Sequence, residues 1–233
     1  GSIDEALSVY DRARREFEMS GLSREELERS EAHRRLALLS SPRVLISDDQ
    51  FGALTLGLCA FRPDVVADSA TLPAAVAHNS GLNSAVDAPS TVFSWLNPPQ
   101  GEYDVVILRV PRQAEYLAWL LRWLNRVMAD SGVLLAGGMI KHLPARSVDV
   151  FAEAVRTEQV LPARKKARVI RCNRGAATLA DWSATWKGYR LGDRKGDVGI
   201  EALPAVFARE KLDIGTRLML PHVVNEVSTA RAG

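Results

Sequence analysis

Acidic residues and a single glycine follow two predicted strands in the first third of the chain. Asp48 and Gly52 lie in the turn SDDQFG after an apolar run at 43–47, and Asp68 follows a second run at 64–67. A dinucleotide or S-adenosylmethionine site has a glycine-rich turn after its first strand and an acidic residue after its second, which holds the ribose hydroxyls. Because this turn has one glycine, we interpret three residues as vestigial positions of a frame that no longer binds a cofactor: Asp48, Gly52 and Asp68.

A basic cluster occupies the start of the last third, with six cations in eleven residues: Arg164, Lys165, Lys166, Arg168, Arg171 and Arg174. Residues 161–233 hold 14 basic and 7 acidic side chains, against 16 and 21 in residues 1–160. Such an excess is typical of a surface that binds polyanions, and we predict that the first four of these cations contact RNA phosphates. A solvated strand edge protected by charge is the alternative. Loops at the carboxyl ends of parallel strands emerge on one side of a sheet, so we expect three further cations to extend the surface: Arg109, Arg112 and Lys141.

The chain offers little other chemistry. Its two cysteines and four histidines lack the spacing of a metal site, so we predict no metal. No apolar run reaches the roughly 18 residues of a membrane span, and we expect a cytoplasmic protein. Asn97-Pro98-Pro99 resembles part of the catalytic motif of amino-group methyltransferases, but it precedes a strand and lacks the aromatic residue that would stack on a base. We interpret it as a loop and predict no catalytic residue.

Apolar runs alternate with helical patterns in the middle of the chain, as expected of a doubly wound α/β fold. The patterns predict strands at 43–47, 64–67, 91–95, 103–110 and 133–136, and helices at 51–61, 71–78, 113–128 and from 147 onward. An antiparallel hairpin of 167–172 with 182–187 is predicted at one edge of the mostly parallel sheet. Charged amphipathic patterns at 3–17 and 24–39 predict an N-terminal helical extension. The predicted fold is therefore Rossmann-like, of the methyltransferase type.

Four segments together carry a resemblance to a known family: FGAL, YDVVILRVPR, RKKARVIRC and FAREKLDIGTRLML. From about Arg43 to Pro221, the chain resembles the N-terminal half of the two-domain bacterial ribosomal RNA guanine-N2 methyltransferases, the "methyltransferase small" family. The resemblance implies a degenerate half that binds no S-adenosylmethionine, helps to fold the enzyme and holds the RNA. It implies that the cofactor and the catalytic motif belong to a C-terminal domain, which four residues of this chain contact: Phe207, Asp213, Gly215 and Thr216.

We therefore predict three regions: a helical extension at 1–40, a non-catalytic methyltransferase-like domain at 41–205, and a linker at 206–233 that leads to the catalytic domain. The predicted function is substrate recognition within an S-adenosylmethionine-dependent rRNA (guanine-N2) methyltransferase. Its expected partners are ribosomal RNA and its own catalytic domain, with no membrane. Two alternatives stay open: an interaction or dimerisation module without RNA binding, and an active methyltransferase whose turn at 48–52 still holds the cofactor.

Overall fold

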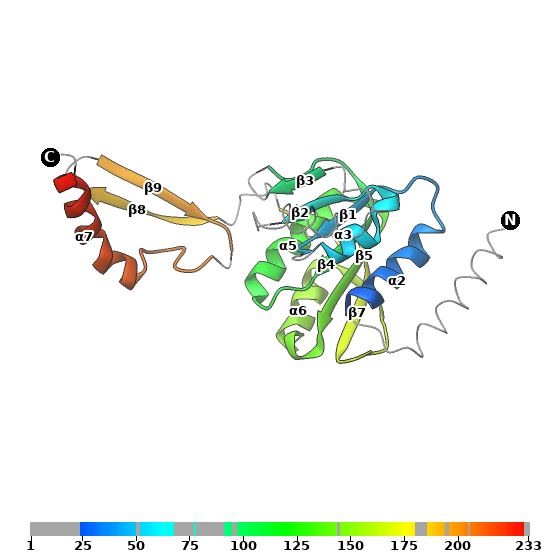
Figure 1. The fold of residues 1–233 in the computed structure, drawn as a ribbon. Helices are drawn as coiled ribbons and strands as arrows, with labels where there is room; N and C mark the ends of the chain where they lie inside the picture. The colour runs from blue at the N-terminus through cyan, green and yellow to red at the C-terminus, as the bar shows by residue number, and fades with distance from the viewer. Residues whose placement is uncertain are drawn as a thin grey trace. The chain divides into compact units, whose positions relative to one another are not determined.

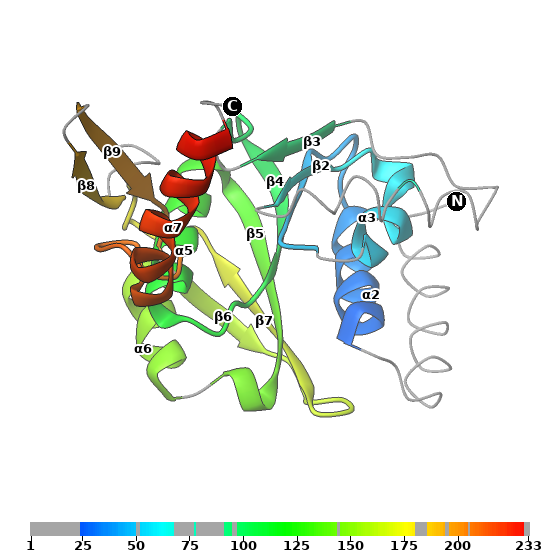
Figure 2. The same cartoon turned by 60° about the vertical axis from the view of Figure 1, so that its left-hand side comes forward.

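Seven strands form one sheet: β1 (Val44–Ser47), β2 (Asp64–Ala67), β3 (Thr91–Ser94), β4 (Tyr103–Arg109), β5 (Met128–Met139), β6 (Arg156–Val160) and β7 (Ala167–Asn173). Their order is β3-β2-β1-β4-β5-β7-β6 (Figures 1 and 2). The computed structural model describes residues 24–49, 52–67, 77, 91–94, 97–143, 145–179, 186–193, 196–204 and 206–230. Neighbours from β3 to β5 are parallel, whereas β7 is antiparallel to both of its neighbours. The predicted Rossmann-like α/β class, mostly parallel with antiparallel strands at one edge, is confirmed.

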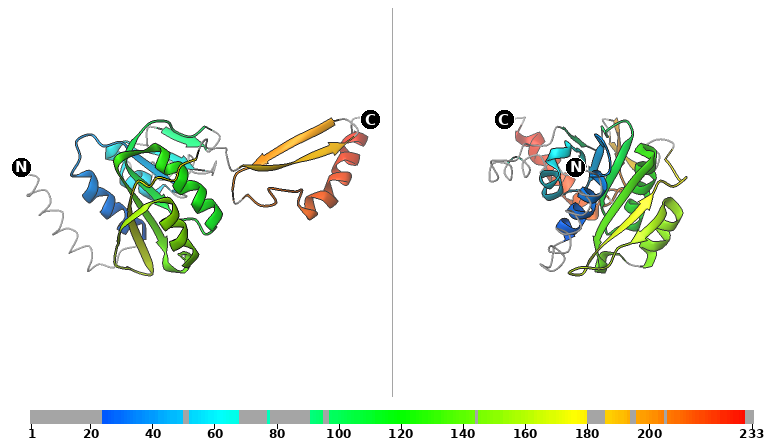
Figure 3. Two further views of the ribbon diagram at one scale, coloured as in Figure 1. Left: turned by 180° about the vertical axis from the view of Figure 1, so that it is seen from behind. Right: turned by 90° about the vertical axis from the view of Figure 1, so that its right-hand side faces the viewer.

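The central strands are short apolar runs because helices cover both faces of the sheet. Leu45 and Ile46 of β1, and Val106 and Ile107 of β4, are 0% exposed. Helices α2 (Arg24–Leu36) and α3 (Ala53–Gly57) cover one face, and α5 (Ala114–Val127) and α6 (Ala145–Ala154) cover the other (Figure 2). The view from behind shows α5 and α6 side by side (Figure 3). Two short 3-10 helices follow α3 and β5, namely η1 (Cys59–Phe61) and η2 (Ile140–His142).

The helix α2 contributes to the core of the sheet. Ala32 is 0% and Leu36 is 1% exposed, and both belong to one buried cluster with residues of β1, β4 and α3. The predicted helix at 24–39 is therefore present, although it ends at Leu36. Its last turns pack as part of the α/β layer, and the predicted regional boundaries after residues 40 and 205 stay predictions.

The predicted pairing of the edge hairpin was wrong. β7 lies between β5 and β6, whereas β8 (Lys187–Asp193) pairs with β9 (Gly196–Ala202) in a separate two-stranded sheet. We missed β6 because all five of its residues are exposed, so its sequence shows no apolar alternation. Residues 182–185 of the predicted partner strand lie outside the described residues.

Residues 179–233 form the second of two units, the first being residues 1–178. The second unit holds the β8–β9 hairpin and α7 (Ile214–Ala230). A side chain at Gly188 of β8 would meet the Ile200 carbonyl oxygen at 2.2 Å, so this strand pair requires glycine there. In the part of the chain that the structure describes, every helix is too short or too polar to span a bilayer.

Several predicted elements can be compared only in part. The helix predicted at 113–128 is α5, except that Met128 begins β5. The helix predicted from 147 onward is α6, which begins at Ala145. The helix predicted at 3–17, and all but residue 77 of the one at 71–78, lie outside the described residues.

His33 of α2 makes the stability of the fold depend on pH. Its Nε2 lies 3.2 Å from the Gly57 carbonyl oxygen, and its ring meets Phe61 edge-on with centroids 5.5 Å apart. Burial lowers the pKa of His33 below 6.5, nearby Arg29 lowers it further, and the hydrogen bond to Gly57 opposes them. The unfolded chain therefore binds this proton at a higher pH than the folded chain does. We expect the free energy of unfolding to fall as the pH decreases from 6.5 to about 5.

Urea unfolding of the wild-type chain and of His33→Gln at both pH values measures this contribution. Glutamine can still donate a hydrogen bond to the Gly57 carbonyl but does not titrate, so the variant should lose less stability between the two pH values. An equal loss in both proteins would contradict the assignment.

Candidate nucleic-acid interface

The two carboxylates of the turn after β1 accept hydrogen bonds from other residues of the chain. Asp49 is 5% exposed, and its Oδ2 accepts hydrogen bonds from the Thr55 backbone N (2.8 Å) and from Thr55 Oγ1 (2.7 Å). Asp49 therefore satisfies a backbone donor of the first turn of α3. Gly52 precedes α3 with a φ of 75°, which glycine adopts readily. Because α3 has only five residues, it presents a weak dipole to an anionic ligand.

Asp48, the other acidic residue of this turn, is held by the helix layer on the opposite face. The Tyr116 hydroxyl of α5 donates a hydrogen bond to Asp48 Oδ2 over 3.2 Å, and the Tyr116 ring stacks on Trp119 with centroids 6.1 Å apart. Of the three vestigial cofactor positions, Asp48 and Gly52 are described, and Asp68 lies outside the described residues. The carboxylates of Asp48 and Asp49 thus both make contacts within the chain.

The cations that we predicted as RNA contacts meet at one edge of the sheet. Arg109, at the end of β4, pairs with Gly137 of β5. The next residue of β5 pairs with Arg168, near the start of the antiparallel β7. Lys141 lies in η2 directly after β5, and Arg112 precedes α5. Together with the turn before β7, this carboxyl edge carries all the predicted contacts: Arg109, Arg112, Lys141, Arg164, Lys165, Lys166 and Arg168.

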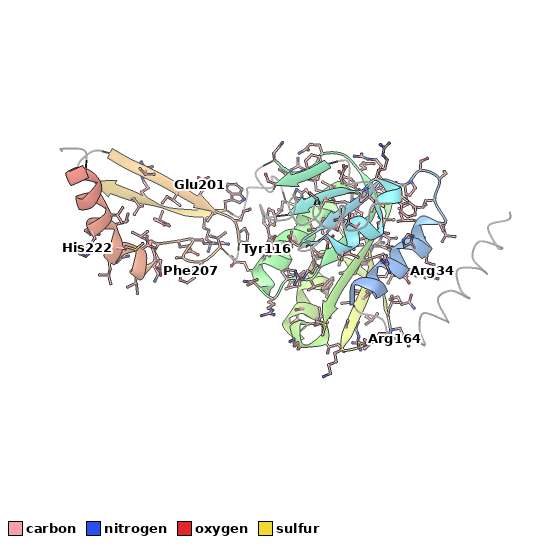
Figure 4. All side chains as sticks on the ribbon, viewed as in Figure 1. Arg34, Tyr116, Arg164, Glu201, Phe207 and His222 are labelled. Atoms are coloured by element: carbon pink, nitrogen blue, oxygen red, sulfur yellow. The ribbon has the colours of Figure 1, made fainter. Side chains whose placement is uncertain are left out.

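Residues 161–166 join β6 to β7, and Lys165 and Lys166 form a two-residue turn at the end of this connection. On either side of them, Arg164 and Ala167 exchange backbone N–H···O hydrogen bonds of 2.9 and 2.7 Å. Both lysines are exposed and have positive φ angles of 43° and 63°, the signature of a type I′ turn, which Asn and Gly favour. A left-handed conformation costs a residue other than glycine about 1 kcal/mol. Figure 2 shows the turn at one end of the sheet, and Figure 4 labels Arg164 beside it.

Two members of the basic cluster are bound to carboxylates instead. Arg171 forms a bidentate ion pair with Glu158 (2.7 and 3.1 Å) and lies 3.6 Å from Glu31 of α2. Arg174 Nη1 lies 2.6 Å from Asp130 Oδ1. These partners belong to β6, α2 and β5, so neighbouring sequence held no sign of the ion pairs. We did not predict Arg171 and Arg174 as RNA contacts. In the structure both form ion pairs that join β7, or the residue after it, to other elements of the fold.

A polar cluster that we did not predict ties the amino ends of the strands together. The Tyr103 hydroxyl donates a hydrogen bond to Asp64 Oδ2 (2.7 Å), and the Arg43 guanidinium lies 4.7 Å from the centroid of the Tyr103 ring. Burial, followed by the hydrogen bond to Asp64, raises the pKa of Tyr103 well above its usual range. The Arg43 backbone N also donates to Asp104 Oδ2 (2.9 Å). Since these residues begin β2 and β4 or precede β1, we assign the cluster a structural role.

Four residues predicted to contact a further domain lie in the second unit. Phe207 is 82% exposed (Figure 4). Asp213 Oδ2 accepts hydrogen bonds from the Thr216 backbone N (3.2 Å) and Oγ1 (3.5 Å), so Asp213 caps the first turn of α7. Gly215 is exposed in that same turn. Their contact with another domain stays a prediction.

The sequence raised two other kinds of site, a metal site and the loop at 97–99. Within them, no group of three or more His, Cys, Asp or Glu side chains could hold a metal ion. The predicted loop at 97–99 is present: the Asn97 backbone N donates to the Ser94 carbonyl over 3.1 Å, and Pro98 and Pro99 are buried.

Comparison with known families matches residues 26–176 to the model described as "RLMG N-terminal domain". Two similar curated proteins are each called "Ribosomal RNA large subunit methyltransferase G". The one from Yersinia enterocolitica is 31% identical over 177 residues, covering 76% of this chain and 44% of the relative. The one from Pseudomonas entomophila is 32% identical over 198 residues, covering 81% and 50%. The chain thus spans about half the length of these relatives.

Two solved structures share the fold. A T. thermophilus 16S rRNA N2 methyltransferase (RsmC), in complex with AdoMet and guanosine, gives a TM-score of 0.58 at 18% identity, covering 83% of this chain and 52% of that one. A ribosomal protein L11 methylase from Lactobacillus delbrueckii subsp. bulgaricus gives a TM-score of 0.51 at 16% identity, covering 65% and 76%. At these identities the similarity establishes the Rossmann-like methyltransferase architecture.

Proposed function

Because this chain belongs to the RLMG N-terminal domain family, we propose that it is the RNA-recognition and structural half of an S-adenosylmethionine-dependent ribosomal RNA (guanine-N2) methyltransferase. In this proposal the chain binds ribosomal RNA in the cytoplasm. S-adenosylmethionine and the catalytic Asn-Pro-Pro-Phe motif belong to the other half of the parent protein. The length of the curated relatives, about twice the matched part, supports a second half of this size.

The composition of the carboxyl edge of the sheet is the observation that carries this proposal. Ligands of doubly wound sheets bind at this edge, and S-adenosylmethionine needs an open glycine-rich turn after the first strand. Here the carboxylates of that turn bond to Thr55 and Tyr116. Beside it, the ends of β4 and β5 and the start of β7 carry the seven predicted cations. An edge of this kind suits a polyanion better than it suits the cofactor.

The second unit supplies a surface for the catalytic half of the parent. Besides Phe207, three apolar residues of α7 are 60 to 70% exposed: Ile214, Leu218 and Met219. Ile214 and Leu218 lie one helical turn apart, and exposed apolar side chains in neighbouring turns are typical of a surface that another protein body covers. We assign the contact with the catalytic domain to this segment, including Phe207, Asp213, Gly215 and Thr216.

The same apolar surface favours the alternative of an interaction or dimerisation module without RNA binding. In that case α7 would pack against a second copy of the chain, and the basic edge would only be solvated. An active methyltransferase is the less favoured alternative, because Asp48 and Asp49 already bond within the chain.

Two titrations of the 233-residue chain test the proposal. A structured ribosomal RNA fragment should bind at physiological salt with a steep salt dependence, because the contacts are to phosphates. S-adenosylmethionine, titrated calorimetrically to millimolar concentration, should give no heat and no thermal stabilisation. Saturable micromolar binding of the cofactor would favour the active enzyme. A chain that dimerises but binds no RNA would favour the interaction module.

A further inference from the structure

The turn between β6 and β7 combines an unfavourable backbone conformation with two long cationic side chains. Lys165 and Lys166 both have positive φ, where Asn and Gly fit better. Such backbone conformations persist only where the surrounding structure imposes them, and they are found most often at functional sites. The turn is therefore a place where function, more than folding, accounts for the residue types.

Neighbouring elements hold this turn in place. The Ile140 backbone N of η2 donates a hydrogen bond to the Lys166 carbonyl (2.8 Å), which fixes the turn to the end of β5. The ion pairs of Arg171 with Glu158 and Glu31 tie β7 to β6 and to α2. The backbone of the two lysines is therefore held in place before a ligand binds. This reduces the conformational entropy that the turn loses on binding.

The chemistry around the turn suits phosphates and lacks the aromatic rings on which unpaired bases stack. Residues 161–168 contain no carboxylate, amide or aromatic side chain. Among the described residues, Lys141, Lys165 and Lys166 form no ion pair. Every aromatic side chain of 24–178 whose burial is described is buried or half-buried. Proteins that bind single strands stack the bases on exposed aromatic rings, whereas duplex RNA is recognised through its shape and backbone.

We infer that the Lys165-Lys166 turn is a contact for the phosphate backbone of double-helical RNA, which binds through its regular phosphate spacing without base readout. This inference rests on the proposed function and narrows it to double-helical RNA and to the Lys165-Lys166 turn as one point of contact. The lysines occupy this turn although their side chains disfavour its conformation. Replacing them should therefore weaken RNA binding while it raises the stability of the fold.

The test uses the 233-residue chain and the double variant Lys165→Asn/Lys166→Gly, which places a favourable type I′ pair in the turn. Fluorescence anisotropy would measure binding to an RNA hairpin of about 20 base pairs, and to a uridine single strand of equal charge, over a range of salt concentrations. The control, Lys187→Ala/Lys211→Ala, also removes two exposed lysines, from the second unit, where Lys187 pairs with Glu210 over 2.9 Å.

The wild-type chain should bind the duplex more tightly than the single strand. The turn variant should lose roughly tenfold or more in duplex affinity near 0.15 M salt, and its slope of log K against log salt should be shallower by about 2. Its melting temperature should rise by about 2–6 °C, because the strain is relieved. The control variant should keep most of the duplex affinity.

Each failure has a distinct meaning. A wild-type chain that binds neither RNA would overturn the proposed function together with this inference. RNA binding with equal affinity for the single strand, or with no loss in the turn variant, would overturn the inference and leave the proposed function standing. A lower melting temperature in the turn variant would contradict the strain at the turn.

Discussion

Replacing Asn125 by alanine should lower the free energy of unfolding of residues 1–178 by about 3–5 kcal/mol. Asn125 is 0% exposed, and its Nδ2 donates to the carbonyl oxygens of Ala154 (2.6 Å) and Ala177 (2.7 Å). Its Oδ1 accepts a hydrogen bond from the Gly175 backbone N (3.0 Å). Alanine would leave these three backbone groups unpaired and create a cavity, so both costs add.

The three hydrogen bonds of Asn125 also support the β6–β7 hairpin that carries the basic turn, because they hold the end of the hairpin opposite that turn. Ala154 ends α6 just before β6, and Gly175 follows β7. Thermal unfolding followed by circular dichroism should show a melting temperature about 10 °C lower for Asn125→Ala. Gln113→Ala is the control, since that exposed residue precedes α5 without a side-chain capping bond. A decrease below about 2 °C for Asn125→Ala would contradict the structural role.

Leu36→Ala should have a comparable effect, because Leu36 anchors α2 in the core of the sheet. The side chain is 1% exposed in the cluster that includes Ile46 of β1 and Val105 of β4. Truncating a fully buried leucine costs about 2–5 kcal/mol, through lost burial and the cavity left behind. Urea unfolding should show a lower midpoint with an unchanged dependence on urea concentration.

Leu38→Ala provides the matched control two residues further along the chain. Leu38 is 42% exposed and lies beyond the end of α2, so its truncation should change the free energy of unfolding by less than about 0.5 kcal/mol. Equal effects of the two substitutions would mean that α2 does not pack on the sheet as described. The comparison therefore also tests whether α2 belongs to the core of the sheet or to a separate region.

Sequence reasoning predicted the structure correctly where a local pattern of apolar residues was typical of one kind of element. The runs that became β1, β2 and β4 have apolar centres because both faces of these strands are buried, and such runs are typical of a covered parallel sheet. The loops after β4 and β5, which carry Arg109, Arg112 and Lys141, lie at the carboxyl edge because parallel strands bring their ends to one side. The role of these cations in RNA binding stays a prediction. The resemblance led to the family that the comparison establishes.

Sequence reasoning failed where residues distant in the chain determine the outcome. The β6 strand carries no apolar alternation because it lies exposed at the edge of the sheet, so only its pairing with β7 reveals it. The ion pairs of Arg171 and Arg174 join elements that the sequence alone does not bring together.

The sequence by itself thus determined the fold class and the concentration of positive charge, because both depend on local composition and periodicity. Its family followed from the resemblance of four segments to known proteins. The tertiary structure decided which strand completes the edge, that α2 belongs to the core, and which cations of the basic cluster are bound to carboxylates. It also decided that Lys165 and Lys166 occupy a left-handed turn. Strand register, helix docking and ion pairing are contacts between distant residues, and their geometry exists only after the chain has folded.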